Sequence, residues 1–388
     1  MTTNTLSTPL GERTRIDVRA IERELTALWK QAAEDQDEGG QAVTRTCVLN
    51  LLVATTGGRA LAEATATIAR LTARHPNRAI VISAVPAVAN PGAIHEPPLL
   101  DAWVQAHCQM PGPGRPQVCC EQITIEARGT AIAHVPGTVL PLLVPDLPVM
   151  FWWPRGASFD DPLFARLCDL ADRVIVDSAT SAAPEAALPR LTTLLDARIA
   201  VSDMAWARLT PWRELIAQFF DAPAMLPHLA TVERVVVEYE ASAGTTEDRT
   251  QAFLLVGWLG SRLGWRPAGP LQRAGDATRL ALARPDGVVV QAELRPVAPQ
   301  DDLLDRLASF TLECPRGRFS VSRTDAPDAA ETHMDVVGMQ PLQRIVRLQR
   351  LDEAGLLAEE IQLLGHDHGF EGALRLATEL LARASEPE

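Results

Sequence analysis

The sequence predicts an α/β protein: a doubly wound, mostly parallel sheet with an antiparallel insertion, plus a smaller C-terminal α+β domain. Through the first half of the chain, short apolar strand patterns alternate with helical patterns, which is typical of β-α-β units. Farther along, alternating strands joined by hairpin turns replace this rhythm. At 388 residues the chain exceeds what one hydrophobic core usually supports, so we expect two domains.

We divide the chain into three parts. Residues 1–14 are expected to be a flexible tail, because MTTNTLSTPLGERT is polar. Residues 15–228 are expected to form a Rossmann-like α/β domain. Residues 229–388 are expected to form an α+β domain with an antiparallel sheet and terminal helices.

The first domain is expected to begin with a one-sided helix, in which Ile21 and Leu25 recur at helical spacing. A buried strand (45–55), a helix (57–75) and a second buried strand (77–85) follow. Because a helix connects the two strands, they are predicted to lie parallel in a sheet covered by helices.

An antiparallel insertion is predicted next. Residues 100–110 and 117–129 alternate polar and apolar side chains and are joined by the turn PGPGRP. We expect this hairpin inside the sheet or at its edge. A helix-like stretch (130–145) then precedes the strand at 147–153.

The α/β alternation then resumes. Asp161 and Pro162 are predicted to be the N-cap and the first residue of a helix. Thr210 and Pro211 start another helix in the same way. Between these two helices we expect a strand, a helix and a strand, at 173–178, 185–197 and 198–204.

The second domain opens with an alternating strand at 231–242 and a largely apolar helix at 248–265. Strands with hairpin turns follow, at Pro285–Gly287 and Pro315–Gly317. The last two helices are expected at 353–365 and 370–384.

Composition excludes several classes of function. A net charge of −13 argues against nucleic-acid binding, which needs clustered positive charge. The N-terminus shows no export signal and no apolar run is long enough for a membrane helix, so we expect a cytoplasmic protein without membrane contact. The six cysteines lack Cys-x-x-Cys spacing, which favours a reduced protein. Cys119 and Cys120 are expected on opposite faces of a strand, one in the core and one near the surface.

Motifs for catalysis or cofactor binding are absent from the sequence. The first strand-to-helix turn, TTGGRA, lacks the three spaced glycines of a dinucleotide site, and Lys30 is the sole lysine, so a P-loop is excluded. There is no Gly-x-Ser-x-Gly elbow. His366 and His368 flank Asp367 in what we interpret as a solvated connector rather than a metal site. We therefore expect no catalytic residues, metal or cofactor.

The best candidates for a binding site lie where the predicted parallel strands end, because ligands of such sheets sit at that edge. Tryptophan, arginine and aspartate gather there and could hold a sugar phosphate, with arginine as the anion clamp. The alternative is that the indoles pack under loops and that Asp177 and Asp203 cap helices. The candidate residues are Trp152, Trp153, Arg155, Asp177, Ser178, Asp203, Trp206, Arg208 and Arg213.

Several long segments resemble the glucose-6-phosphate dehydrogenase assembly proteins, the OpcA family. The segments are CCEQITIEARG, PLLVPDLPVMFWWP, DRVIVDS, DMAWARLTPWRELIAQFFD and LLAEEIQLLGHDHGFEGAL. The resemblance implies a non-catalytic partner that promotes assembly of the dehydrogenase and activates it, in the oxidative pentose phosphate pathway. In cyanobacterial members that this sequence resembles, control is tied to redox state through cysteines, but we match none of the six cysteines here to a regulatory one.

The resemblance suggests a role for the aromatic clusters, because tryptophan and arginine dominate the centres of protein interfaces. We expect the candidate tryptophans and arginines to form or support one surface that contacts the dehydrogenase, or a sugar phosphate that modulates the contact. Trp212 is expected in the core. Two alternatives stay open: an enzyme acting on sugar phosphates through Arg155, Asp177 and Asp203, and a scaffold for other partners.

Overall fold

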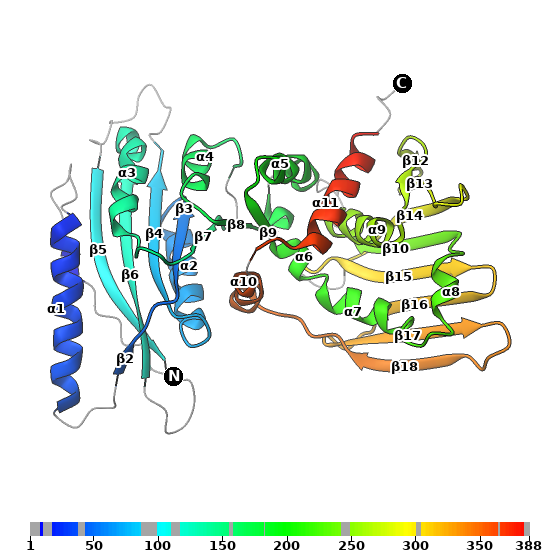
Figure 1. The fold of residues 1–388 in the computed structure, drawn as a ribbon, viewed down its shortest axis with the longest axis horizontal. Coiled ribbons are helices and arrows are strands. Elements are labelled where there is room, and N and C mark those ends of the chain that lie inside the picture. The colour runs from blue at the N-terminus through cyan, green and yellow to red at the C-terminus, as the bar shows by residue number, and fades with distance from the viewer. Residues whose placement is uncertain are drawn as a thin grey trace. The chain divides into compact units, whose positions relative to one another are not determined.

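The computed structural model describes most of the chain. The described residues are 8–10, 18–37, 43–86, 99–109, 117–154, 158–181, 183–241, 249–299, 304–363 and 365–383. They form two compact units, each built around its own sheet (Figure 1). The first unit comprises Met1–Asp177, Ile199–Val201 and Asp352–Leu364, and the second comprises Ser178–Arg198, Ser202–Leu351 and Gly365–Glu388.

This division differs from the predicted boundary at 228/229. Helix α5 (Pro184–Asp196) packs against α11 (His368–Leu381), so the chain enters the second unit at Ser178. Helix α10 (Glu353–Gln362) instead packs against α2 (Gly58–Leu71), which brings a C-terminal segment back into the first unit. The boundaries of the two units are therefore set by packing between helices that lie far apart in the sequence. Local sequence patterns do not predict such packing.

The first sheet is mostly parallel, as predicted. Its strands are β1 (Thr8–Leu10), β2 (Val43–Arg45), β3 (Leu49–Thr55), β4 (Asn77–Val85), β5 (Leu99–Gln109), β6 (Gln117–Arg128), β7 (Val149–Trp152), β8 (Arg173–Val176) and β9 (Ala200–Asp203). They follow the order β1-β5-β6-β4-β3-β7-β8-β9, with β2 beside β6. The hairpin β5–β6 is the predicted antiparallel insertion, and β6 pairs in parallel with β4.

The N-terminal tail is only partly as expected. Its residues 8–10 form β1, which pairs antiparallel with β5 through Thr8 and Val104, Pro9 and Trp103, and Leu10 and Ala102. The other residues of the predicted tail lie outside the described part of the chain.

Two predictions about the helices of the first unit are confirmed. Asp161 caps α4 (Pro162–Cys168), because its carboxylate accepts a hydrogen bond from the backbone N–H of Leu163 at 2.8 Å. On α1 (Val18–Asp37), Ile21 and Leu25 are buried as the helical spacing predicts. The remaining helical segments are η1 (Gly129–His134), α3 (Val135–Val139) and η2 (Leu140–Leu142).

The second unit has an almost wholly antiparallel sheet. Its strands are β10 (Arg234–Glu240), β11 (Arg266–Pro267), β12 (Gln272–Ala274), β13 (Ala277–Ala283), β14 (Val289–Val297), β15 (Leu307–Cys314), β16 (Gly317–Arg323), β17 (Ala329–Val336) and β18 (Leu342–Arg347). The order is β11-β13-β14-β10-β15-β16-β17-β18, with β12 beside β13. Among the described strands of this second sheet, only β10 and β14 pair in parallel. Like the first sheet, it has nine described strands.

Both predicted hairpin turns are confirmed. Gly287, in the turn between β13 and β14, has a φ of +84°, a left-handed conformation that favours glycine. The carboxylate of Asp286 accepts a hydrogen bond from Val288 N–H at 3.1 Å and stabilises this turn. Cys314 pairs with Gly317 across the turn between β15 and β16.

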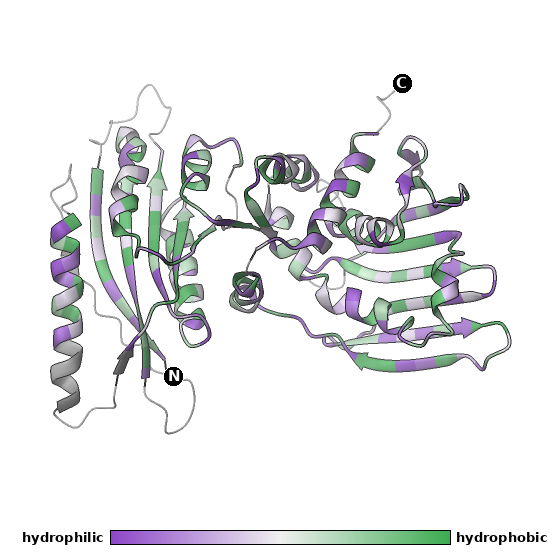
Figure 2. Ribbon diagram, viewed as in Figure 1, coloured by the Kyte–Doolittle hydropathy of each residue, from purple (hydrophilic) through white to green (hydrophobic). Residues whose placement is uncertain are grey.

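Close helix packing completes the second unit. Gly257 on α9 (Thr250–Leu263) lies against the backbone of Ala373 on α11, where any Cβ would collide with the carbonyl oxygen. Figure 2 shows both hydrophobic and hydrophilic residues along β15–β18. On β13 every second residue is buried, including Leu280 and Leu282, because this strand buries one face. The other helices are η3 (Ser178–Thr180), α6 (Met204–Ala207), α7 (Thr210–Gln218) and α8 (Leu226–Leu229). Within the described residues, no helix has both the length and the apolar character that spanning a membrane requires.

Candidate functional site

The predicted site residues are divided between the two units. Trp152, Trp153 and Asp177 belong to the first unit. The second unit contains Ser178, Asp203, Trp206, Arg208 and Arg213. Arg155 lies outside the described residues.

The tryptophans of the first unit belong to its core. Trp152, the last residue of β7, is 0% exposed, and Trp153 is buried beside it. Trp153 packs edge-on against Phe164 of α4, with ring centroids 5.1 Å apart, and against Phe151 at 5.5 Å. An indole without exposed surface cannot contact a partner in this conformation, so the packing alternative describes both tryptophans.

Asp203 is a structural carboxylate at the end of β9. One oxygen accepts hydrogen bonds from the backbone N–H groups of Ala205 and Ser178, both at 3.0 Å. The other accepts one from the Ser178 hydroxyl at 2.5 Å. Asp203 is thus the N-cap of α6, as the helix-cap alternative predicted, and it fixes the start of η3 as well. Asp177 is also buried.

Trp206 joins α6 to the start of α11. Its indole N–H donates to Asp367 at 2.9 Å, and its ring lies 5.8 Å from that of Phe370. Asp367 in turn caps α11 by accepting from the N–H groups of Gly369 and Phe370. The Arg213 guanidinium lies 3.6 Å from the centre of the Trp206 ring, a cation–π contact. Trp206 is therefore core as well, at 2% exposed, and so is Trp212, as expected.

Arg208 and Arg213 are the two predicted site residues, among those described, whose side chains are not fully buried. Arg213 donates to the Thr210 hydroxyl at 2.8 Å. Arg208 lies near the carboxyl group of Asp305. Burial raises the pKa of that carboxyl to about 6, although the charges of Arg350 and Arg208 act to lower it.

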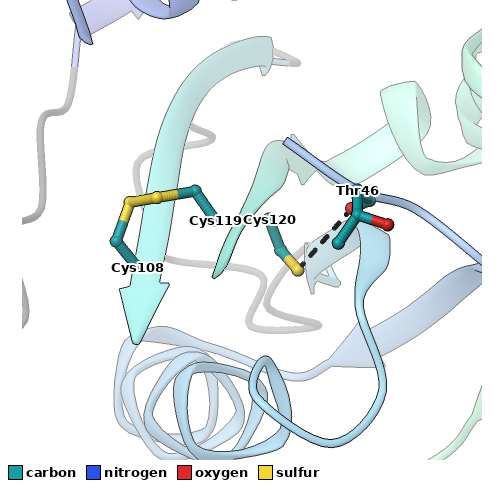
Figure 3. Close-up of a disulfide and its surroundings, with 4 residues drawn as sticks. All are labelled: Thr46, Cys108, Cys119 and Cys120. Carbon is teal, nitrogen blue, oxygen red and sulfur yellow. Dashed lines mark hydrogen bonds between the residues drawn. A yellow bond between two sulfur atoms is a disulfide. The ribbon is translucent and has the colours of Figure 1, made fainter. Parts of the chain in front are cut away.

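The cysteines differ from the prediction of a reduced protein. Cys108 and Cys119 face each other across β5 and β6 and form a disulfide, with Cα atoms 4.1 Å apart (Figure 3). Cys120 and Cys119 are both buried, whereas we expected one of them near the surface. Alternation along the strand places Cys120 away from the disulfide, and burial raises the pKa of its thiol to about 11.

The structure also reveals a cysteine–histidine pair that the sequence did not indicate. Nδ1 of His228, on α8, lies 3.2 Å from Sγ of Cys314, and the same thiol donates to the carbonyl of Gly317 at 3.3 Å. Both side chains are partly exposed. The pair is separated by 86 residues in the chain, so no local spacing could have shown it. Among the other free thiols, burial raises the pKa of Cys168 to about 12.

His366 lies on the exposed connector before α11, and His368 is the exposed first residue of that helix. Their rings stack with centroids 6.4 Å apart, and His366 Nδ1 lies 2.5 Å from the carboxylate of Glu371. Nowhere in the described ranges do three or more His, Cys, Asp or Glu side chains form a group that could hold a metal ion.

Two family models match most of the chain. The glucose-6-phosphate dehydrogenase subunit N-terminal domain matches residues 68–193, and the C-terminal domain of that subunit matches residues 199–374. The chain belongs to the OpcA family.

Two curated relatives share the OpcA name. The OpcA protein of Nostoc punctiforme is 31% identical over 277 residues, which cover 69% of this chain and 58% of that protein. The OpcA protein of Synechocystis sp. is 27% identical over 279 residues, which cover 68% of this chain and 56% of that protein. Both are named as OxPP cycle proteins. The chain thus spans less than two thirds of the length of these OpcA relatives.

Solved structures with a similar chain path are oxidoreductases. An NAD binding oxidoreductase from Klebsiella pneumoniae is 10% identical with a TM-score of 0.48, covering 87% of this chain and 96% of that chain. The UDP-N-acetylglucosamine 3-dehydrogenase GnnA from Acidithiobacillus ferrooxidans is 11% identical with a TM-score of 0.43, covering 88% of this chain and 98% of that chain. Identities this low carry no information about activity.

Proposed function

We propose that this OpcA-family chain is a non-catalytic assembly factor of glucose-6-phosphate dehydrogenase, which activates that enzyme in the cytoplasm as part of the oxidative pentose phosphate pathway. The observation that carries the proposal is the match of residues 68–193 and 199–374 to two domains of a glucose-6-phosphate dehydrogenase subunit. The names of the two OpcA relatives, which refer to the OxPP cycle, support the same pathway.

Polar side chains at the strand ends form hydrogen bonds within the protein, which supports a non-catalytic role. Both carboxylate oxygens of Asp203 accept hydrogen bonds from the protein itself, from Ser178 and Ala205. The indole of Trp206 is engaged with Asp367 and Arg213. Side chains held in this way stabilise local structure, so they favour a rigid binding partner over an enzyme of sugar phosphates.

Arg208 and Arg213 are the residues of the predicted site best suited to contact the dehydrogenase. Both residues are partly exposed, although Nε of Arg213 is buried, and arginine is enriched among the residues that dominate binding energy. The buried indole of Trp206 lies under Arg213 and limits its motion, at 3.6 Å. A pre-ordered arginine loses less conformational entropy when it binds, which favours affinity.

Activation requires the chain to bind the active form of the dehydrogenase more tightly than the inactive form, because equal binding shifts no equilibrium. A tenfold activation through such a shift corresponds to about 1.4 kcal/mol of differential binding. One well-placed arginine can contribute that much.

Mixing the purified chain with glucose-6-phosphate dehydrogenase tests the proposal. We expect higher dehydrogenase activity and a larger oligomer by light scattering. If neither changes at any substrate concentration, the proposal is wrong.

Two substitutions test the contact surface. Arg208→Ala and Arg213→Ala are each expected to weaken activation about tenfold. Arg273→Ala, an exposed arginine on β12, is the matched control and should leave activation unchanged. Thermal unfolding of each variant separates lost contact from lost stability. Full activation by both stable variants would remove these arginines from the interface.

A further inference from the structure

A polar groove lies beside helix α2 in the first unit. It has a volume of about 970 Å³ and is lined by α2, by β5 and β6, and by Glu353 of α10. Alternate residues of β5 face it, because side chains two apart share one face of a strand. These residues are Trp103, Gln105, His107 and Gln109.

A network of uncharged polar side chains joins lining residues of the groove to Gln122, which is buried beneath them. His107 Nε2 lies 2.9 Å from Oε1 of Gln122 and 3.1 Å from Nε2 of Gln105. The Gln122 amide donates to the hydroxyls of Thr124 at 3.0 Å and Thr65 at 3.1 Å. A sheet face next to a helix is ordinarily apolar, since burying amides and imidazoles costs free energy unless they are hydrogen-bonded. The packing of helix α2 on the sheet does not by itself explain why polar side chains occupy this face.

His107 retains a free hydrogen-bonding atom. Its side chain is 1% exposed, and Nδ1 has no hydrogen-bond partner among the described residues. Burial lowers the pKa of the imidazole, which keeps it neutral. If the Nε2 proton is donated to Gln122, Nδ1 holds a lone pair and can accept a hydrogen bond. Leaving such a buried acceptor unpaired costs about 1–3 kcal/mol, so a donor at this position would stabilise the site.

Two of the charged side chains in the lining, Arg70 and Glu63, form ion pairs. Arg70 forms an ion pair with Asp352 at 2.8 Å. Glu63 forms one with Arg59 at 3.0 Å. Glu353 accepts a hydrogen bond from the Thr67 hydroxyl at 3.0 Å. Phosphate and carboxylate ligands need uncompensated positive charge, so this groove disfavours them.

We propose that this groove binds a small, neutral, polyhydroxylated compound such as an unphosphorylated sugar or a polyol. Hydroxyl groups both donate and accept hydrogen bonds, which matches the amide of Gln105 and the imidazole of His107. The amide oxygen of Gln109 adds an acceptor, while its N–H group donates to the Ala69 carbonyl. Trp103, which is partly exposed, supplies an aromatic surface for the apolar C–H groups of such a ligand. The site is independent of the dehydrogenase-binding role.

Calorimetric titration of the full chain with single probes tests the site. The neutral probes are D-glucose and myo-inositol, and glucose 6-phosphate is the anionic counterpart. We expect saturable binding of at least one neutral probe with a Kd on the order of 1 mM, as is usual for small polar ligands. Glucose 6-phosphate should bind more weakly than D-glucose. Tighter binding of the phosphate, or no saturable binding of either neutral probe, would overturn the proposal.

Variants with matched controls locate the binding. Trp103→Leu and Gln105→Leu should each weaken the affinity about tenfold, through lost aromatic contact and a lost hydrogen bond. Trp258→Leu on α9 and Gln343→Leu on β18 make the same chemical changes in the second unit and should leave the affinity unchanged. Circular dichroism verifies that each variant is folded. Unchanged affinity in both folded groove variants would show that the compound binds elsewhere. The dehydrogenase is absent from these titrations, so their failure would not affect the proposed assembly role.

Discussion

The tryptophans in the tryptophan-rich stretches are buried, whereas aliphatic residues of the hairpin β17–β18 are exposed. Residue type alone would have suggested the opposite for both regions. Trp152 is 0% exposed, and Trp206 is buried as well. On the hairpin, Val337 is 62% exposed and Ile345 is 73% exposed. The aromatic residues that resemble interface anchors are core, whereas ordinary aliphatic residues face solvent.

Position in the sheet explains the difference. Strand β7 lies between β3 and β8 in a parallel sheet, so both of its faces are buried and a continuous apolar run is needed. Strand β18 lies at the end of the second sheet, next to β17. An edge strand is packed against fewer neighbours, so its side chains are more exposed. The charges of Arg344 and Arg347 on β18 disfavour edge-to-edge pairing with other chains. Burial therefore follows neighbours rather than residue type.

The largest expected effect is that of Trp152→Ala. Removing a fully buried indole leaves a cavity and should lower the free energy of unfolding by about 3–5 kcal/mol. Urea denaturation followed by circular dichroism measures this change. A loss below about 1 kcal/mol would mean that the side chain is less well packed than the structure indicates.

Asp203→Ala is expected to rank second. The substitution leaves the N–H groups of Ser178 and Ala205 without their acceptor, which should cost about 2 kcal/mol. Asp161→Ala, which removes the more exposed cap of α4, is the control and should cost about 1 kcal/mol. Equal costs for the two caps, measured by urea denaturation, would contradict the structural role of the buried network.

Trp206→Phe should have a smaller effect than either of these. It preserves an aromatic ring but removes the donor to Asp367. Trp152→Phe is its control, because the Trp152 indole N–H has no hydrogen-bond partner in the described part of the chain. We expect Trp206→Phe to cost about 1 kcal/mol more than the control, the usual value of one hydrogen bond. A smaller loss at Trp206 than at Trp152, in the same denaturation experiment, would argue against a stabilising role for the hydrogen bond.

The smallest effect is expected for Ile345→Ser on the exposed hairpin. Its free energy of unfolding should change by less than about 0.5 kcal/mol, as for most surface substitutions. Loss of exposed apolar area should also reduce self-association at high concentration, which analytical ultracentrifugation measures. A large loss of stability would show that Ile345 is covered in solution.

Much of the local structure could be predicted from the sequence. The antiparallel insertion β5–β6, the cap at Asp161 and the turn at Gly287 all lie where short patterns placed them. The strand-end site was only partly predictable. The sequence supplied candidate residues, but whether Trp152 or Arg208 reaches solvent depends on segments far away in the chain.

By itself, the sequence determined the α/β class, the order of the main elements and the family, because periodicity, caps and turns depend on residues a few positions apart. Only the tertiary structure decided which elements share a unit, and it alone revealed the Cys108–Cys119 disulfide, the His228–Cys314 pair and the polar groove beside α2. Each of these requires elements from separate parts of the chain to pack against one another. Such packing is settled by the burial of whole faces, which no single stretch of sequence encodes.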